Sequence, residues 1–189
     1  MKLFSFSRKQ DSGPDDPYWE FNPSGHFRPK ISREAFEKQT GFDFGWLLLE
    51  PLSDMIKKKR HEIDRGRRLS YGQKSLYYWW YIDAEVTNGG FVQFYYNGYD
   101  EYVPTIVRGL EYINDSEMVA LVQRADALYQ KKKRIIERAR DEQSFGDNLY
   151  DQLEDFEVLD NEYYKLHHQT MARFEAYIRQ HPEEFCELE

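Results

Sequence analysis

Residues 76–98 read Leu-Tyr-Tyr-Trp-Trp-Tyr-Ile-Asp-Ala-Glu-Val-Thr-Asn-Gly-Gly-Phe-Val-Gln-Phe-Tyr-Tyr-Asn-Gly and carry the strongest structural signal in the chain. Residues 76–86 leave almost no polar face, and a helix that is apolar on nearly all sides is a buried, central one. Asn88-Gly89 is expected to end this helix, because glycine readily adopts the left-handed conformation that closes helices. Residues 91–96 then predict a short aromatic helix that ends at Asn97-Gly98.

The remainder of the chain predicts an all-α fold. Apolar residues recur at the three-four spacing of amphipathic helices, and no strand-like alternation persists over four to eight residues. Ser116 is the expected cap of a long helix, and Trp79, Trp80, Phe91 and Phe94 are the expected centre of the core. The predicted helices cover residues 46–63, 70–88, 104–113, 116–140 and 158–180.

Residues 1–45 are expected to form an irregular extension that packs on a helical domain of residues 46–189. Four of the seven prolines fall there (Pro14, Pro17, Pro23 and Pro29), and this density prevents a long helix. The segment is nevertheless rich in aromatic residues, which are scarce in disordered linkers. One short helix is expected within residues 31–39, with Ser32 as its cap.

The length and composition of the chain indicate the size of its core and the compartment in which it folds. A chain of 189 residues can bury a sizeable core without disulfides, and the single cysteine, Cys186, fits a reducing compartment. No apolar run approaches the roughly 20 residues of a membrane span, and the start of the chain lacks the apolar core of a secretory signal. We therefore expect a cytoplasmic protein without membrane contact.

The net charge of −8 is distributed unevenly. Residues 141–189 carry 14 Asp and Glu against three Lys and Arg, a net −11, which leaves +3 for residues 1–140. An acidic surface repels nucleic acid and attracts basic partners. The alternative interpretation is a solvated face that only keeps the protein soluble.

Seven acids between the last two long helices form the candidate partner-binding surface. Positions 147, 151, 154 and 155 have three-four spacing, so one helix through them would align carboxylates about 5–6 Å apart. That spacing resembles the spacing of successive phosphates along one DNA strand. This acidic set consists of Asp147, Asp151, Glu154, Asp155, Glu157, Asp160 and Glu162.

The glycine-rich phrase contains side-chain amides that need a separate interpretation. Asn88, Gln93 and Asn97 could line a small polar pocket, but amides that cap free backbone groups at helix ends are the more ordinary case. An amide has no titratable group and cannot act as a general base. We take the phrase as a structural signature made of Asn88, Gly89, Gly90, Phe91, Gln93, Phe94 and Asn97.

The residues do not combine into a catalytic or metal-binding motif. The five histidines show no ligand spacing, and one cysteine cannot form a cysteine-based zinc site. There is no nucleophile elbow, P-loop or dinucleotide fingerprint. Asp83, on the central helix, is expected to be an internal hydrogen-bond acceptor. We expect a protein without cofactor, metal or enzymatic activity.

Two basic runs leave a rival function open. Residues 57–60 with Arg65, Arg67 and Arg68, and residues 131–134 with Arg138 and Arg140, could bind phosphates beside aromatic residues that stack on bases. The net negative charge argues against direct nucleic-acid binding. Both runs could instead pair with the acidic residues, within one chain or across a homodimer.

Three phrases resemble the bacterial DNA-mimic-protein family, a group of small all-helical domains. They are Trp46-Leu-Leu-Leu-Glu-Pro-Leu, the phrase at residues 88–97, and Tyr177-Ile-Arg-Gln-His-Pro-Glu-Glu-Phe, so the resemblance covers about residues 46–185. It implies a binding protein and not a catalyst. No acidic residue is carried over, because the acidic set lies outside the matching phrases.

Charge and resemblance together give the functional hypothesis. The protein is expected to bind a basic partner, a DNA-binding transcription regulator, and to block that partner's DNA site. The alternatives are an immunity- or antitoxin-like protein that covers a basic toxin, and direct nucleic-acid binding through the basic runs.

Overall fold

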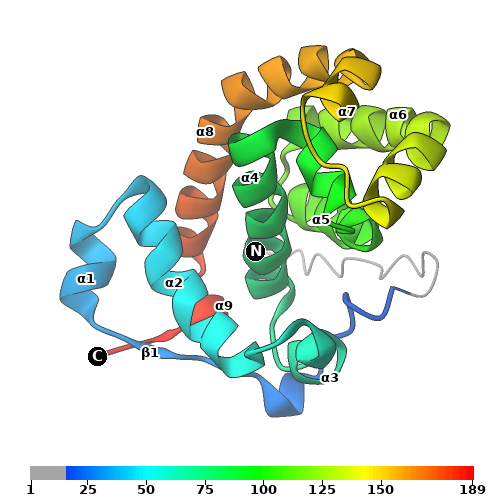
Figure 1. The fold of residues 1–189 in the computed structure, drawn as a ribbon. Helices are drawn as coiled ribbons and strands as arrows, with labels where there is room; N and C mark the ends of the chain where they lie inside the picture. The colour runs from blue at the N-terminus through cyan, green and yellow to red at the C-terminus, as the bar shows by residue number, and fades with distance from the viewer. Residues whose placement is uncertain (1–15) are drawn as a thin grey trace, which may run out of the picture.

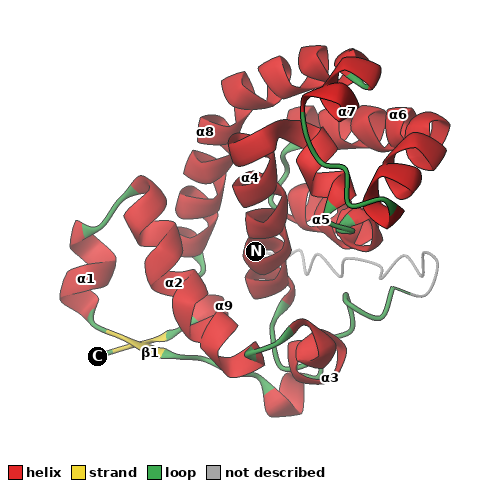
Figure 2. Ribbon diagram, in the orientation of Figure 1, coloured by secondary structure: helices red, strands yellow, loops and turns green. Residues whose placement is uncertain are grey.

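Helix α4, Tyr71–Tyr96, runs through the middle of the molecule, and helices α2, α5, α6 and α8 all pack against it (Figure 1). The computed structural model describes residues 16–189, and nearly all of its regular structure is helical (Figure 2). The predicted all-α fold is therefore confirmed. Pro14 and the remainder of residues 1–15 of the expected extension lie outside the described residues.

The described helices have the following bounds. In chain order, they are α1 Arg33–Lys38, α2 Gly41–Ile56, α3 Glu62–Gly66, α4, α5 Val103–Tyr112, α6 Ser116–Asp141, α7 Asp147–Gln152, α8 Glu157–Gln180 and α9 Pro182–Phe185. Short 3-10 turns are η1 Pro23–Gly25, η2 Lys59–His61, η3 Asp100–Tyr102 and η4 Glu154–Phe156. None of the helices within residues 16–189 combines the length and hydropathy of a membrane span.

The start of α4 is fixed by a reciprocal cap. Ser70 Oγ accepts from the Gln73 amide at 3.1 Å, and Gln73 Oε1 accepts from the Ser70 amide at 2.9 Å. Such a capping box satisfies two backbone donors that a helix start otherwise leaves free. Gln73 Nε2 also donates to the carbonyls of Phe27 and Phe185, so the cap holds both ends of the chain against α4.

Large aromatic side chains fill the core around α4. Trp79, Phe91 and Phe94 are fully buried, as predicted. Trp80 is only partly buried, so that prediction is wrong; its ring lies at the outer side of α4, against Phe42 and Trp46 of α2. The most apolar helix therefore keeps Trp80 partly at the surface, and Tyr81 beside it is likewise only partly buried.

Several boundaries differ from those predicted, and the helix predicted over residues 46–63 ends at Ile56, where Lys57 takes φ +68° and η2 and α3 follow. Helix α2 starts at Gly41 and not at Trp46, so the expected division at residue 45 falls inside a helix, and Phe44 belongs to the core. The cap of α6 is Asp115, whose carboxylate accepts from the Met118 amide at 3.2 Å, and not Ser116. The short helix capped by Ser32 is confirmed as α1.

A two-stranded parallel sheet closes the fold and was not predicted. Strand β1, Lys30–Ile31, pairs with β2, Glu187–Leu188. The segment before β1 also packs on the helices, since Tyr18 lies edge-on to Tyr102 and Trp19 stacks on Tyr71. The N-terminal segment from residue 16 and the C-terminal residues thus lie against the same helical body.

Candidate functional site

The glycine-rich phrase forms a break within α4, as the sequence predicts. Gly89 and Gly90 leave helical geometry, and Gly90 has φ +71°. A Cβ atom at Gly90 would lie 2.4 Å from Asp160 Oδ2, so a side chain is excluded both by backbone conformation and by contact. The second helical part, residues 91–96, ends where Gly98 takes φ +78°.

Side chains from α7 and α8 satisfy the backbone groups that the break sets free. Asp160 Oδ1 accepts from the Phe91 amide at 2.8 Å, and Tyr150 donates to the Gly89 carbonyl at 2.9 Å. Burial raises the pKa of Asp160 to about 6, although the Phe91 amide favours its ionised form. Asp160, one of the acidic set, therefore caps a helix within the protein.

Two of the three amides of the phrase donate to one carboxylate and the third donates to one of these two amides, whereas capping of helix ends was the expected role. Gln93 Nε2 and Asn97 Nδ2 both donate to Glu85 Oε2, at 2.8 and 2.7 Å, and Asn88 donates to Gln93 at 3.0 Å. These bonds join the two parts of α4 across the break. The amides hold the bend in place by these hydrogen bonds.

The acidic set lies on two α-helices, α7 and α8, and on the 3-10 turn η4 between them, and not on one continuous helix. Helix α7 ends at Gln152, because Leu153 leaves helical geometry and η4 follows. Leu149, Leu153 and Phe156 are buried against the core, and this anchoring turns the acids between them outward. Asp147 and Asp151 share α7, about 6 Å apart along its axis, and Glu157, Asp160 and Glu162 share α8.

Three members of the acidic set are engaged within the protein. Besides Asp160, Asp155 pairs with Lys132 at 2.6 Å, and Glu162 pairs with Arg124. These two ion pairs join the start of α8 and η4 to α6. The suggestion that the second basic run meets the acidic region within one chain is confirmed for Lys132 alone.

The other four acids remain free at the surface. Asp147, Asp151, Glu154 and Glu157 are exposed and form no ion pair with any residue in 16–189. Asp141 and Glu142, at the end of α6, are likewise exposed and precede them in the chain. We call these six residues the free acidic surface. Sequence reasoning missed the last two because they lie at a helix end, before the seven acids that it singled out.

Most of the first basic run is occupied by contacts within the protein. Lys59 pairs with Glu101 at 2.7 Å, and Arg67 pairs with Glu20 at 2.8 Å. Arg65 donates to the carbonyls of Met55 and Ile56. Such contacts hold the turn between α2 and α4 and leave few of its charges for a phosphate backbone.

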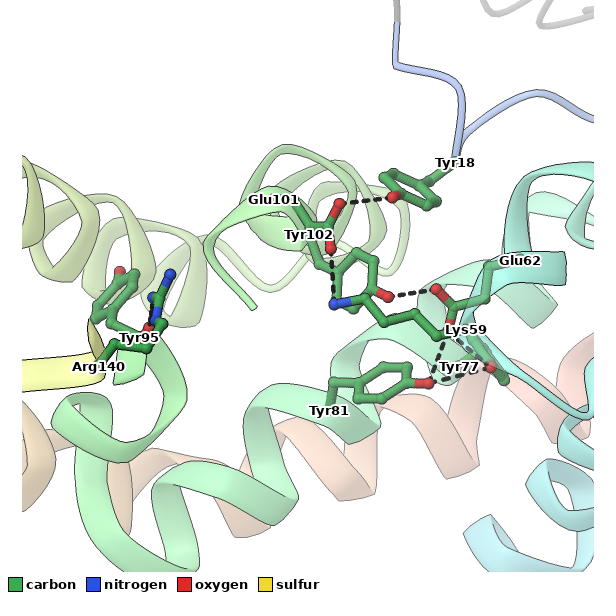
Figure 3. A network of polar contacts seen from close by, with 9 residues as sticks. All are labelled: Tyr18, Lys59, Glu62, Tyr77, Tyr81, Tyr95, Glu101, Tyr102 and Arg140. Carbon is green, nitrogen blue, oxygen red and sulfur yellow. Dashed lines mark hydrogen bonds and ion pairs between the residues drawn. The ribbon is translucent and has the colours of Figure 1, made fainter. Parts of the chain in front are cut away.

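A buried carboxylate surrounded by phenols lies beneath that turn (Figure 3). Glu62 is fully buried; it accepts from Tyr81 at 2.7 Å, from Tyr77 at 3.1 Å and from Tyr102. Burial raises the pKa of Tyr77 and Tyr81 far above the usual value, so both phenols remain protonated donors. The cluster joins α3, α4 and η3.

Asp83 is a buried acceptor, as the sequence predicts. Tyr163 of α8 donates to its Oδ1 at 3.0 Å, and His167 Nδ1 lies 3.5 Å from the same atom. Burial raises the pKa of Asp83 to about 6. This cluster ties α4 to α8 and, like Glu62 and Asp160, uses its carboxylate for packing.

Comparison with known proteins identifies the family. The family model described as DMP19-like protein matches residues 67–181, which contain the broken helix α4 and the acidic set. The chain belongs to the DMP19-like family. The earlier resemblance is thereby confirmed, although the phrase that starts at Trp46 lies outside the match.

The chain is also similar in sequence to a bacterial protein over part of its length. The chain is 29% identical over 122 residues to DNA mimic protein DMP19 of Neisseria meningitidis serogroup B (strain ATCC BAA-335 / MC58). The aligned part covers 64% of this chain and 74% of that protein.

Proposed function

We propose that this DMP19-like protein is a non-catalytic interaction module that binds a basic DNA-binding regulator and occupies that partner's DNA site. The free acidic surface carries the proposal: carboxylates without partners, fixed on α7 and the adjoining turns, offer negative charge to Lys and Arg side chains that otherwise contact phosphates. The name of the Neisseria relative supports the same role.

The carboxylates inside the molecule fit a binding protein better than an enzyme. Asp83, Asp160 and Glu62 are each held by hydrogen bonds from tyrosine hydroxyls or a backbone amide. A catalytic acid or base needs access to a substrate atom, whereas these groups join helices. The acids of the free acidic surface, by contrast, form no ion pair within residues 16–189.

The test compares two variants with the same change of charge. The first neutralises four free acids, as Asp147→Asn, Asp151→Asn, Glu154→Gln and Glu157→Gln. The matched control neutralises four exposed acids of α1 and α2 that form no ion pair within residues 16–189, as Glu37→Gln, Asp43→Asn, Glu50→Gln and Asp54→Asn. Both variants gain four charge units, and neither changes a buried residue.

Immobilised wild type, test variant and control are used to capture proteins from a bacterial lysate, which are identified by mass spectrometry. The captured partner should be a basic DNA-binding protein, retained at least about tenfold less by the test variant at 0.1 M salt. Capture by wild type should fall steeply with salt, because exposed charges are screened over about 10 Å at that concentration.

The purified partner then gives the decisive measurement. Wild type should displace the partner from its duplex DNA in a mobility-shift assay, and the test variant should not. Equal displacement by both variants would mean that the free acidic surface is only a solvated face. If wild type itself shifts duplex DNA, direct nucleic-acid binding replaces this proposal; if the captured partner is a basic toxin, the immunity-like function does.

A further inference from the structure

A cavity of about 370 Å³ opens between α2, α4 and the turn at residues 57–59. This volume lies within the range of small-molecule pockets in proteins. The turn belongs to the loop between α2 and α4, whereas the free acidic surface lies on α7 and its neighbours, in a different part of the molecule (Figure 1). The cavity is therefore independent of the proposed partner-binding surface.

Aromatic rings form the side walls of the cavity. Trp46 and Trp80 line it from α2 and α4, and Tyr99 lines it from the segment after α4. Trp46 is 43% exposed, and its ring centroid lies 5.9 Å from that of Trp80. Lys59 Nζ lies 5.2 Å from the Tyr99 ring centroid and covers that ring, so the partly exposed indole rings of Trp46 and Trp80 are the ones that favour stacking by a planar ring.

Two lysines at the mouth supply positive charge. Lys57 has φ +68°, and the Lys58 amide donates to the Ile56 carbonyl at 2.9 Å, which makes a γ-turn of the rare, strained kind. Both side chains are exposed and form no ion pair within residues 16–189, whereas neighbouring Lys59 is held by Glu101 (Figure 3). The strained turn thus presents two unpaired ammonium groups to the cavity.

The carboxylate of Glu85, on the side of the cavity formed by α4, has one oxygen without a hydrogen-bond donor from residues 16–189. Glu85 lines the cavity, and both of its amide donors, Gln93 and Asn97, reach Oε2. Within residues 16–189 no donor reaches Oε1 at hydrogen-bond distance. That oxygen is available to an N–H group of a ligand, and its position is fixed by the break in α4.

We propose that this cavity binds a nucleoside phosphate. The base would stack against Trp46 and Trp80 and donate an N–H to Glu85, and the phosphate would lie at Lys57 and Lys58. A nucleobase supplies a planar face for the tryptophans and an N–H donor for Glu85. Its phosphate supplies the negative charge that the two lysines attract. The same chemistry occurs in a free nucleotide and at the phosphorylated end of a single strand.

Isothermal titration calorimetry with the full chain tests the site. The probes are AMP, GMP, adenosine, inorganic phosphate and a short 5′-phosphorylated single-stranded oligonucleotide. AMP or GMP should bind saturably at millimolar concentration or below, and adenosine and phosphate alone should each bind at least about tenfold more weakly. If the oligonucleotide binds about tenfold more tightly than AMP, the ligand is the phosphorylated end of a single strand. Otherwise the ligand is the free nucleotide.

Three variants locate the binding. Lys57→Gln with Lys58→Gln, and separately Trp46→Ala, should each weaken nucleotide binding at least about tenfold. The matched control, Lys131→Gln with Arg134→Gln, removes two exposed charges of α6 and should change nothing. All five substituted positions are exposed, and helix content from circular dichroism verifies that each variant is folded.

Three results would overturn the proposal. They are the absence of saturable binding by either nucleotide, binding of inorganic phosphate as tight as that of the nucleotides, and affinity that both cavity variants leave unchanged. None of these results depends on whether the free acidic surface binds a partner, because every probe and variant acts at the cavity.

Discussion

The backbone amide of Phe91 donates to the carboxylate of Asp160 across 2.8 Å, so the first turn of α8 caps the second half of α4. The acid that fixes the break therefore comes from another helix, far along the chain. This contact and the bond from Tyr150 to the Gly89 carbonyl together satisfy the backbone of the break, and the amide cluster on Glu85 spans it.

Replacing Asp160 with Ala should lower the free energy of unfolding by about 1–2 kcal/mol, the usual loss when a helix cap is removed. Urea denaturation followed by circular dichroism measures the change. Asp151→Ala is the matched control, because Asp151 is exposed and free, and it should change stability by less than about 0.5 kcal/mol. Equal effects of the two changes would contradict the capping role.

Gly90→Ala should destabilise the protein by roughly 3 kcal/mol. Its positive φ is strained for any residue with a Cβ atom, and that atom would lie 2.4 Å from Asp160. Gly146→Ala is the control, since a Cβ there meets nothing within 4 Å. Thermal unfolding of both variants provides the comparison, and an unchanged melting temperature for Gly90→Ala would refute the strained break.

Stability should depend on pH through Asp83. Burial raises its folded pKa to about 6 from an ordinary value of 3.8, so between these values the folded state holds a proton that the unfolded chain has lost. The contribution of Asp83 to the free energy of unfolding is therefore most favourable below pH 4 and declines as pH rises through 6. Asp83→Asn removes this titration while keeping an oxygen that accepts from Tyr163.

The measurement for Asp83 is the difference in unfolding free energy between wild type and Asp83→Asn across pH 4–7. Wild type should lose on the order of 2 kcal/mol relative to the variant over this range. His167 titrates in both proteins, with a pKa lowered by burial, so it is largely removed by the subtraction. If the difference in unfolding free energy does not change with pH, ionisation of Asp83 does not destabilise the folded state.

Glu62→Ala should destabilise the protein by at least about 3 kcal/mol, because three phenol hydroxyls lose their acceptor in the interior. Tyr77→Phe, which removes one donor and keeps the carboxylate, should have about a third of that effect. Chemical denaturation of both variants and wild type measures the ratio. Similar losses for the two changes would show that the carboxylate does not organise the cluster.

The central helix and its break could be predicted because their signals are local. Residues 76–86 are apolar on nearly all sides, and glycine at positions 89 and 90 permits the non-helical backbone that interrupts a helix. The end of α7 could not be predicted from the sequence. Its apolar residues Leu149, Leu153 and Phe156 keep the spacing of a continuing helix, although the chain turns between them. Tertiary burial of these three side chains overrides the local pattern.

The internal clusters were hidden for a different reason. Glu62 lies in a run of charged residues that resembles a solvated surface, yet it is fully buried. A usable signal was present: Tyr77 and Tyr81 lie one turn apart on a buried helix, and their hydroxyls require an acceptor. Which acid supplies that acceptor depends on the packing of α3 against α4, and the sequence pattern does not contain it.

The pairing of β1 with β2 connects residues near opposite ends of the chain, Lys30 with Glu187 and Ile31 with Leu188. Closing so long a loop is entropically unfavourable, and two residue pairs cannot offset it until the helices between them have assembled. We therefore expect this sheet to form after the rate-limiting step of folding. Weakening it should then leave the folding rate nearly unchanged and accelerate unfolding, so that the strands would prolong the lifetime of the folded state.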